Sequence, residues 1–292
     1  MSDQAVLVDV AWVREHQDKV VLLDATLPPP GVVPAVDTRA GYVAKHLPGA
    51  VFFDIEALSD EETTLPHMLP APERFARVMG ALGVPSAGPD VSSADASRGG
   101  ATLVVYEQTG VFSAPRAWWM LRVMGAKDVR VLHGGLAAWE AAGLPLEQGE
   151  VKRAPARFDA TLRREAVASL ADLMLALEQN LQVADARSAA RFAGSAPEPR
   201  AGLESGHMPC AVSVPYTELV ADGRMKDAEG IAAVFQARGV DVARPVVTTC
   251  GSGVTAAVLA LGLELCGAKQ VRLYDGSWAE YASRPCASIV KG

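Results

Sequence analysis

Short apolar runs alternate with stretches of helical spacing along the first half of the chain. Runs of β-branched and other apolar residues predict four strands, over Val20–Asp24, Ala50–Phe53, Thr102–Tyr106 and Val129–Leu132. Apolar positions three and four residues apart predict helices over Pro72–Leu82 and Ala114–Met124. Strands that alternate with helices are typical of a mainly parallel sheet with helices on both faces, so we predict the α/β class.

The second half of the chain repeats the first. The run Gly125–Gly135 (GAKDVRVLHGG) matches Gly267–Ser277 (GAKQVRLYDGS) at a constant spacing of 142 residues, and His46–Ala50 (HLPGA) matches His207–Ala211 (HMPCA). Copies of this length suit two tandem domains rather than the units of a solenoid. We expect a first domain over residues 1–147, a linker over 148–164 and a second domain over 165–292.

Composition excludes several classes of function. The chain has 292 residues, half of them hydrophobic, and a net charge of -7, so we expect no nucleic-acid partner. No apolar run approaches the roughly 18 residues of a membrane span, and the N-terminus does not resemble a signal peptide. Four cysteines without zinc spacing predict neither a disulfide framework nor a metal site, which favours a reducing cytoplasm. We expect no cofactor.

One cysteine has the surroundings of a nucleophile. Cys250 follows the β-branched run Val246–Thr249 and precedes Gly251, Ser252 and Gly253, after which a long apolar stretch begins. This pattern predicts a buried strand, a tight loop and a helix. Backbone N–H groups in such a loop and the N-terminus of the helix favour a thiolate, which is the reactive form of cysteine. Most free cysteines are simply small buried residues, but the flanking glycines favour an enzyme.

The spacing of 142 residues places Gln108 opposite Cys250 and Gly110 opposite Ser252. The first copy therefore keeps the fold and lacks the nucleophile, so we expect it to be inactive.

Arginines indicate an oxyanion site. Arg187 follows the predicted strand end Val183–Asp185, where open parallel sheets bind ligands, and Arg191 and Arg200 follow soon after. A guanidinium can hold a carboxylate through two parallel hydrogen bonds. The alternative is an ion pair with an acidic side chain.

Outside the repeat, His67 lies in a loop between prolines and Glu56 lies upstream of it. From the sequence alone, a structural histidine and a catalytic one both remain open.

These residues resemble the rhodanese superfamily, and in particular its mercaptopyruvate branch. Cys250–Ala256 (CGSGVTA) resembles the active loop, Tyr42–Ala50 the N-terminal signature, and Tyr274–Tyr281 (YDGSWAEY) the C-terminal signature. The resemblance covers nearly the whole chain and implies two tandem rhodanese-like domains, of which the second is catalytic.

The resemblance also implies roles for individual residues. Cys250 would take sulfur from a donor as a persulfide, and Arg187 would bind the donor's carboxylate. Ser252, His67 and Glu56 would form a proton relay, although some relatives have Asp at the last position. The remaining expected donor-binding residues are Arg191, Arg200, Gly251, Gly253, Val254 and Thr255. The implied partners are a small-molecule sulfur donor and an acceptor, which is a thioredoxin-like protein, a small thiol or cyanide. We expect a monomer.

Gly251 and Ser252 bear on the choice of donor. The thiosulfate branch resembles CRKGVTA, in which both positions are cationic, whereas the two uncharged residues here suit the single carboxylate of mercaptopyruvate. We expect cations introduced at both positions to favour thiosulfate. Three alternatives remain open: a thiosulfate sulfurtransferase, a non-catalytic persulfide carrier and a cysteine phosphatase. The last is disfavoured because Ala256 stands where phosphatases have an arginine.

Overall fold

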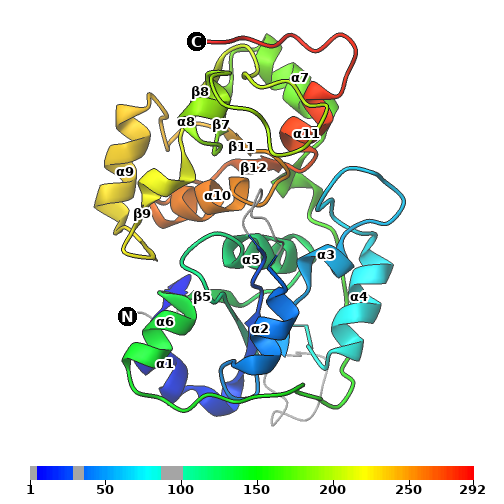
Figure 1. Ribbon diagram of the computed structural model, residues 1–292, viewed down its shortest axis with the longest axis vertical. Helices are drawn as coiled ribbons and strands as arrows, with labels where there is room; N and C mark the ends of the chain where they lie inside the picture. The colour runs from blue at the N-terminus through cyan, green and yellow to red at the C-terminus, as the bar shows by residue number, and fades with distance from the viewer. Residues whose placement is uncertain (1–4, 29–35, 87–100) are drawn as a thin grey trace. The chain divides into compact units, whose positions relative to one another are not determined.

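A computed structural model describes residues 5–28, 36–86 and 101–292. The chain forms two compact units, which are coloured from blue to red along the sequence in Figure 1. The first unit contains Met1–Leu58 and Pro70–Arg163, and the second contains Ser59–Leu69 and Arg164–Gly292. The division near Arg163 falls within the expected linker. The assignment of Ser59–Leu69 to the second unit has no counterpart in the sequence pattern.

The first unit contains a five-stranded sheet in the order β1-β5-β4-β2-β3, and all its paired strands are parallel. Its strands are β1 (Leu7–Val8), β2 (Val20–Asp24), β3 (Val51–Phe52), β4 (Thr102–Tyr106) and β5 (Val129–Leu132). Its helices are α1 (Val10–Glu15), α2 (Thr38–Ala44), α3 (Ile55–Leu58), α4 (Pro72–Ala81), α5 (Ala114–Val123) and α6 (Gly135–Ala141).

The second unit repeats this topology. Its sheet has the order β6-β12-β11-β7-β8, again with parallel pairs, and a short antiparallel pair, β9 and β10, lies outside it. The strands are β6 (Val167–Ala168), β7 (Gln182–Asp185), β8 (Ala211–Ser213), β9 (Val220–Ala221), β10 (Arg224–Met225), β11 (Val246–Thr249) and β12 (Val271–Tyr274). The helices are α7 (Leu170–Glu178), α8 (Ala189–Phe192), α9 (Ala228–Ala237), α10 (Ala256–Leu265) and α11 (Ser277–Ala282).

Helices cover both faces of the second sheet (Figure 1). Val183, Val247 and Tyr274 of the strands share one buried cluster with Leu173 of α7 and Trp278 of α11. On the other face α10 contacts β11 and β12, and α9 packs against α10. The long apolar run in α10 follows from this burial, because nearly all of its residues are enclosed. The predicted α/β class and the duplication are confirmed. Within the described ranges, no helix is long and apolar enough to cross a membrane.

The structure corrects the counterpart of Cys250 in the first unit. Asp24 of β2 pairs with Tyr106, whereas Asp185 of β7 pairs with Thr249, so Tyr106 corresponds to Thr249. The next residues, Glu107 and Cys250, are therefore counterparts.

Backbone hydrogen bonds agree with this assignment. The Glu107 carbonyl accepts from the Leu136 N–H at 3.0 Å, as the Cys250 carbonyl accepts from the Trp278 N–H at 2.9 Å. The prediction of Gln108 was wrong because the first loop has one more residue before its helix than the second loop has. A constant spacing cannot register this difference.

Glu107 places a buried carboxyl group in the first loop. Its buried carboxylate accepts hydrogen bonds from the backbone N–H groups of Phe112, Ser113 and Ala114, at distances of 2.7 to 3.1 Å, and from the Ser113 hydroxyl. Burial raises the pKa of Glu107 to about 7, and the backbone donors oppose this shift. The first copy of the loop therefore holds a carboxylate where the second holds sulfur.

The raised pKa of Glu107 makes the stability of the first unit depend on pH. The folded protein binds the proton of Glu107 more tightly than the unfolded chain does, so this stabilisation is complete below the ordinary pKa and is lost as pH rises through about 7. Relative to Glu107→Gln, the wild type should lose about 3 kcal/mol of unfolding free energy between pH 5 and pH 8.

Urea unfolding at several pH values measures this loss. Tryptophan fluorescence reports mainly on the first unit, which holds Trp12, Trp118, Trp119 and Trp139. If the difference in unfolding free energy between Glu107→Gln and the wild type were the same at every pH in this range, the raised pKa of Glu107 would be contradicted.

Candidate active site

Cys250 directly follows β11, in the predicted loop before α10. The residue is 2% exposed. Its N–H donates to the Ser277 Oγ at 3.3 Å, and the Gly251 carbonyl accepts from the Ala279 N–H at 3.0 Å. The start of α11 thus holds the backbone of the loop through hydrogen bonds. Ser277 has a φ of +51°, in the left-handed region, where its counterpart Gly135 also lies.

His67 and Ser252 come together in the second unit. His67 Nδ1 lies 2.9 Å from Ser252 Oγ, and both residues are 7% exposed. Ser252 is two residues from Cys250, so this pair stands beside the nucleophile. Of the two interpretations of His67, the structure favours the catalytic one, because a histidine next to a serine hydroxyl can move a proton in either direction. The third expected member, Glu56, lies exposed on α3 of the first unit.

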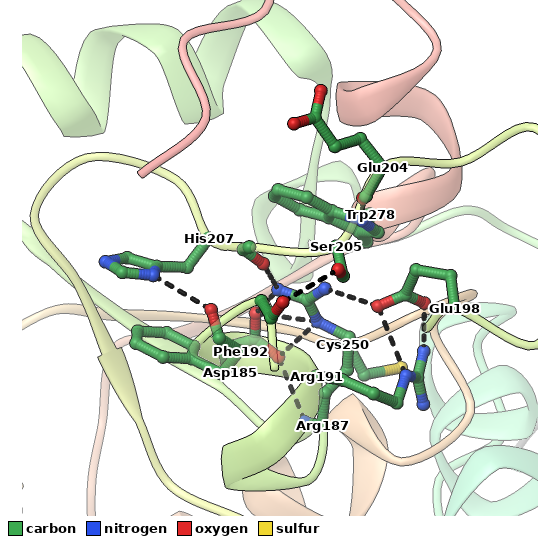
Figure 2. A network of polar contacts seen from close by, with 12 residues as sticks. Asp185, Arg187, Arg191, Phe192, Glu198, Glu204, Ser205, His207, Cys250 and Trp278 are labelled. Carbon is green, nitrogen blue, oxygen red and sulfur yellow. Dashed lines mark hydrogen bonds and ion pairs between the residues drawn. The ribbon is translucent and has the colours of Figure 1, made fainter. Parts of the chain in front are cut away.

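Arg187 is enclosed by protein partners (Figure 2). Its Nε and Nη2 donate to the Asp185 carboxylate at 3.0 and 2.6 Å, its Nη1 to Glu198 Oε1 at 2.8 Å, and its Nη2 also to the Gly206 carbonyl at 2.8 Å. The guanidinium carbon lies 4.1 Å from the ring centre of Trp278. Burial alone would lower the pKa of Arg187, but the charges of Asp185 and Glu198 and their hydrogen bonds raise it.

These contacts change the expected role of Arg187. Its side chain is 0% exposed, whereas that of Arg191 is 18% exposed. A donor can therefore reach Arg191 more directly than Arg187. The geometry favours Arg187 as the support of the site.

Arg191 and Arg200 reach the residue after the cysteine. A Cβ atom on Gly251 would lie 2.9 Å from Arg191 Nη2 and 3.9 Å from Arg200 Nη1. Glu198 orients Arg191, whose Nε and Nη2 both donate to its carboxylate. The loop itself carries no positive charge at Gly251 and Ser252. Arg191 of α8 and Arg200 of the following segment supply that charge instead.

The geometry bears on the expectation about donor choice, which stays a prediction. An arginine introduced at Gly251 would require the end of the Arg191 side chain to move, because a Cβ atom there would lie 2.9 Å from Arg191 Nη2. The neutral loop alone is therefore not a measure of the charge around the donor.

The other expected loop residues form the link between Cys250 and α10. Gly253 has a φ of +80°, which a residue with a side chain rarely adopts, and Gly110 of the first loop has a φ of +78°. Val254 is buried, and Thr255 is half-buried at the N-cap of α10.

Sequence reasoning missed the roles of Asp185, Glu198 and Trp278. A signal was present, because a buried arginine requires acidic partners and Glu198 stands between Arg191 and Arg200. No cluster that could hold a metal ion occurs among the residues that the structure describes.

Arg187→Ala should destabilise the second unit. The substitution would leave the carboxylates of Asp185 and Glu198 buried without their main partner, which costs about 3–5 kcal/mol of unfolding free energy. Denaturant unfolding measures this loss. The matched control is Arg238→Ala, since Arg238 pairs with Glu218 and both side chains are about one-third exposed, so its loss should be at most about 1 kcal/mol. Equal losses in the two variants would contradict the supporting role of Arg187.

Comparison with known proteins agrees with this description. Residues 9–142 and 169–284 each match the rhodanese-like domain family. The chain is 45% identical over 280 residues to an Escherichia coli protein named 3-mercaptopyruvate sulfurtransferase, covering 95% of both chains. It is 41% identical to the human protein of that name, covering 95% of this chain and 92% of the relative. A bovine thiosulfate sulfurtransferase is 38% identical, with coverage of 95% and 92%.

Solved structures give the same result. The crystal structure of SseA from Escherichia coli, described as a 3-mercaptopyruvate sulfotransferase, superposes with a TM-score of 0.83 at 43% identity, covering 94% of this chain and 99% of that one. The two ranges that match the family model lie in the two units, and the second range includes Cys250. The chain therefore belongs to the rhodanese family, as a member with two rhodanese-like domains.

Proposed function

We propose that this protein is a 3-mercaptopyruvate sulfurtransferase that carries the transferred sulfur on Cys250. The observation that supports this proposal most strongly is the arrangement around one loop. Three functional groups meet at Cys250, Gly251 and Ser252. Cys250 is the proposed nucleophile, and Ser252 contacts His67. The guanidinium groups of Arg191 and Arg200 lie near Gly251. A thiol, a proton-transfer pair and an oxyanion site are what sulfur removal from a mercapto acid requires.

In the first step the Cys250 thiolate attacks the sulfur of mercaptopyruvate. A sulfur–sulfur bond forms and the carbon–sulfur bond breaks, with its electron pair left on the carbon as the enolate of pyruvate. The enolate takes up a proton and leaves as pyruvate, while Cys250 keeps the sulfur as a persulfide. His67 and Ser252 are placed to move protons in this step, because their 2.9 Å contact links an imidazole to a hydroxyl two residues from the nucleophile.

In the second step an acceptor thiolate attacks the outer sulfur of the persulfide. The new sulfur–sulfur bond forms as the bond to Cys250 breaks, and the Cys250 thiolate is restored. We propose a thioredoxin-like protein or a small thiol as the acceptor, with cyanide as a substitute in assays. All four cysteines are free, which supports a reducing compartment such as the cytoplasm, and we propose that the protein acts as a monomer.

Donor choice follows from where the cations lie. Arg191 and Arg200 approach Gly251 from one segment, so they suit a carboxylate held at one end of the donor, away from the sulfur that Cys250 attacks. Glu198 offsets part of this charge. We propose Glu56 as a further member of the relay, on the resemblance alone. Thiosulfate is the second candidate donor, because the bovine relative carries that name. A side-by-side assay of both donors with cyanide distinguishes the two.

Cys250→Ser should abolish sulfur transfer from mercaptopyruvate. Serine keeps the shape of the loop, but its hydroxyl cannot form a persulfide. The intact mass of the wild type should rise by one sulfur atom after donor treatment without an acceptor, and the mass of the variant should not change. Cys266→Ser is the matched control, since Cys266 lies at the far end of α10, and it should retain both the mass change and the activity. Turnover by the Cys250 variant would contradict the proposal.

Arg191→Gln should raise the KM for mercaptopyruvate by about ten- to a hundred-fold, since a charge-assisted hydrogen bond contributes roughly 1.5–3 kcal/mol. The fold should tolerate the change better than Arg187→Ala, because the Arg191 side chain is partly exposed. Steady-state kinetics with a fixed acceptor measure KM and kcat separately. Arg238→Gln removes the same charge from an ion pair elsewhere in the unit and should leave KM unchanged. An unaltered KM in Arg191→Gln would assign carboxylate binding to Arg200 or Arg187.

A further inference from the structure

The segment Ser59–Leu69 supplies His67 to the second unit without forming a helix or strand of its own. The Asp60 N–H donates to the Met68 carbonyl at 3.0 Å and closes the segment as a loop. His67 has a φ of +60°, in the left-handed region that residues with a side chain adopt only when their surroundings hold them there. The position of His67 therefore depends on contacts beyond the loop.

One such contact comes from the C-terminal signature of the second unit. The Leu69 N–H donates to Asp275 Oδ2 at 2.8 Å. Asp275 directly follows β12 and is 4% exposed. Its backbone is fixed on both sides, by the sheet before it and by α11 after it, so its carboxylate is a rigid acceptor. A hydrogen bond from an N–H to a buried carboxylate is among the stronger ones in proteins.

We propose that Asp275 is a positioning residue that fastens the loop Ser59–Leu69 so that His67 meets Ser252. This inference rests on the proposed function, in which His67 and Ser252 transfer protons. Leu69 is two residues from His67, so the fastened amide lies within about 8 Å of the His67 backbone along the chain. A loosened amide therefore shifts the imidazole directly.

The first unit supports a role specific to the active loop. The counterpart of Asp275 there is His133, at the end of β5, in the unit whose loop holds Glu107 in place of a nucleophile. A carboxylate at this position is not required to build the strand or the turn into the following helix, because the first unit builds both without one. The acid is present in the unit that must hold a histidine beside its cysteine.

Kinetics of a double-mutant cycle test the proposal. Asp275→Ala should lower kcat for mercaptopyruvate by about ten- to a hundred-fold, because a displacement near 1 Å of a catalytic group has that size of effect. The KM should change little, since Arg191 and Arg200 lie on another segment. In a His67→Ala background the same substitution should cost less than about two-fold, because no histidine remains to be positioned. Asp275→Asn keeps an oxygen acceptor for Leu69 and should recover most of the activity.

Hydrogen exchange separates this inference from the proposed function. Exchange of the Leu69 amide should accelerate in Asp275→Ala, whatever His67 does in catalysis, and should stay slow in Asp275→Asn. Asp241→Ala is the matched control, since the Asp241 carboxylate accepts from the Ala243 N–H in another loop of the same unit, and it should alter neither exchange at Leu69 nor kcat.

The outcomes differ for each failure. Unchanged Leu69 exchange in Asp275→Ala would overturn the positioning role itself. Faster exchange with full activity in both Asp275→Ala and His67→Ala would instead overturn the proton-transfer role of His67. Equal losses of kcat from Asp275→Ala with and without His67 would show that Asp275 acts on the fold as a whole and would overturn the proposal.

Discussion

The buried ion network around Arg187 is the constraint on which the site of the second unit depends. A guanidinium without exposure to water is stable only when carboxylates and carbonyls replace its hydration, and Asp185, Glu198 and Gly206 do so here. Because Asp185 belongs to β7 and Glu198 to the segment after α8, the network ties that segment to the sheet. The ring of Trp278 in α11 packs against one side of the Arg187 guanidinium (Figure 2). The orientation of Arg191 toward Gly251 follows, since the same Glu198 carboxylate holds it.

The two copies of the loop differ in the side chain that directly follows the strand. In the first, three successive N–H groups converge on the Glu107 carboxylate and offset part of the cost of burying it. A carboxylate fixed in this way has no exchangeable sulfur and fills the site permanently. In the second copy the same position belongs to Cys250. The duplication thus preserves the order of strand, loop and helix and changes the side chain that directly follows the strand.

The N-terminal half of the sequence also supplies part of the second unit. The loop Ser59–Leu69 belongs to the N-terminal half of the sequence but packs with the second unit, where it brings His67 to Ser252. The second half alone, from Arg164 onward, would lack this histidine. We propose that the N-terminal half of the sequence contributes a proton-transfer side chain in this way, although it contains no cysteine.

The sequence by itself determined the elements, the duplication and the loop that carries Cys250. Strands β2, β4 and β5 begin and end where their apolar runs do, because buried parallel strands require unbroken hydrophobic sequences. Gly253 marks the loop after Cys250, because its φ of +80° favours glycine. Tertiary structure decided the rest. Strand pairing identified Glu107 as the counterpart of Cys250. A constant spacing of 142 residues could not do so, because the two loops differ in length by one residue. Whether Arg187 or Arg191 faces the donor depended on burial, because the same side chain binds a ligand or supports the fold according to which carboxylates lie within hydrogen-bonding distance. His67 needed a contact between residues 185 positions apart, which no local pattern encodes.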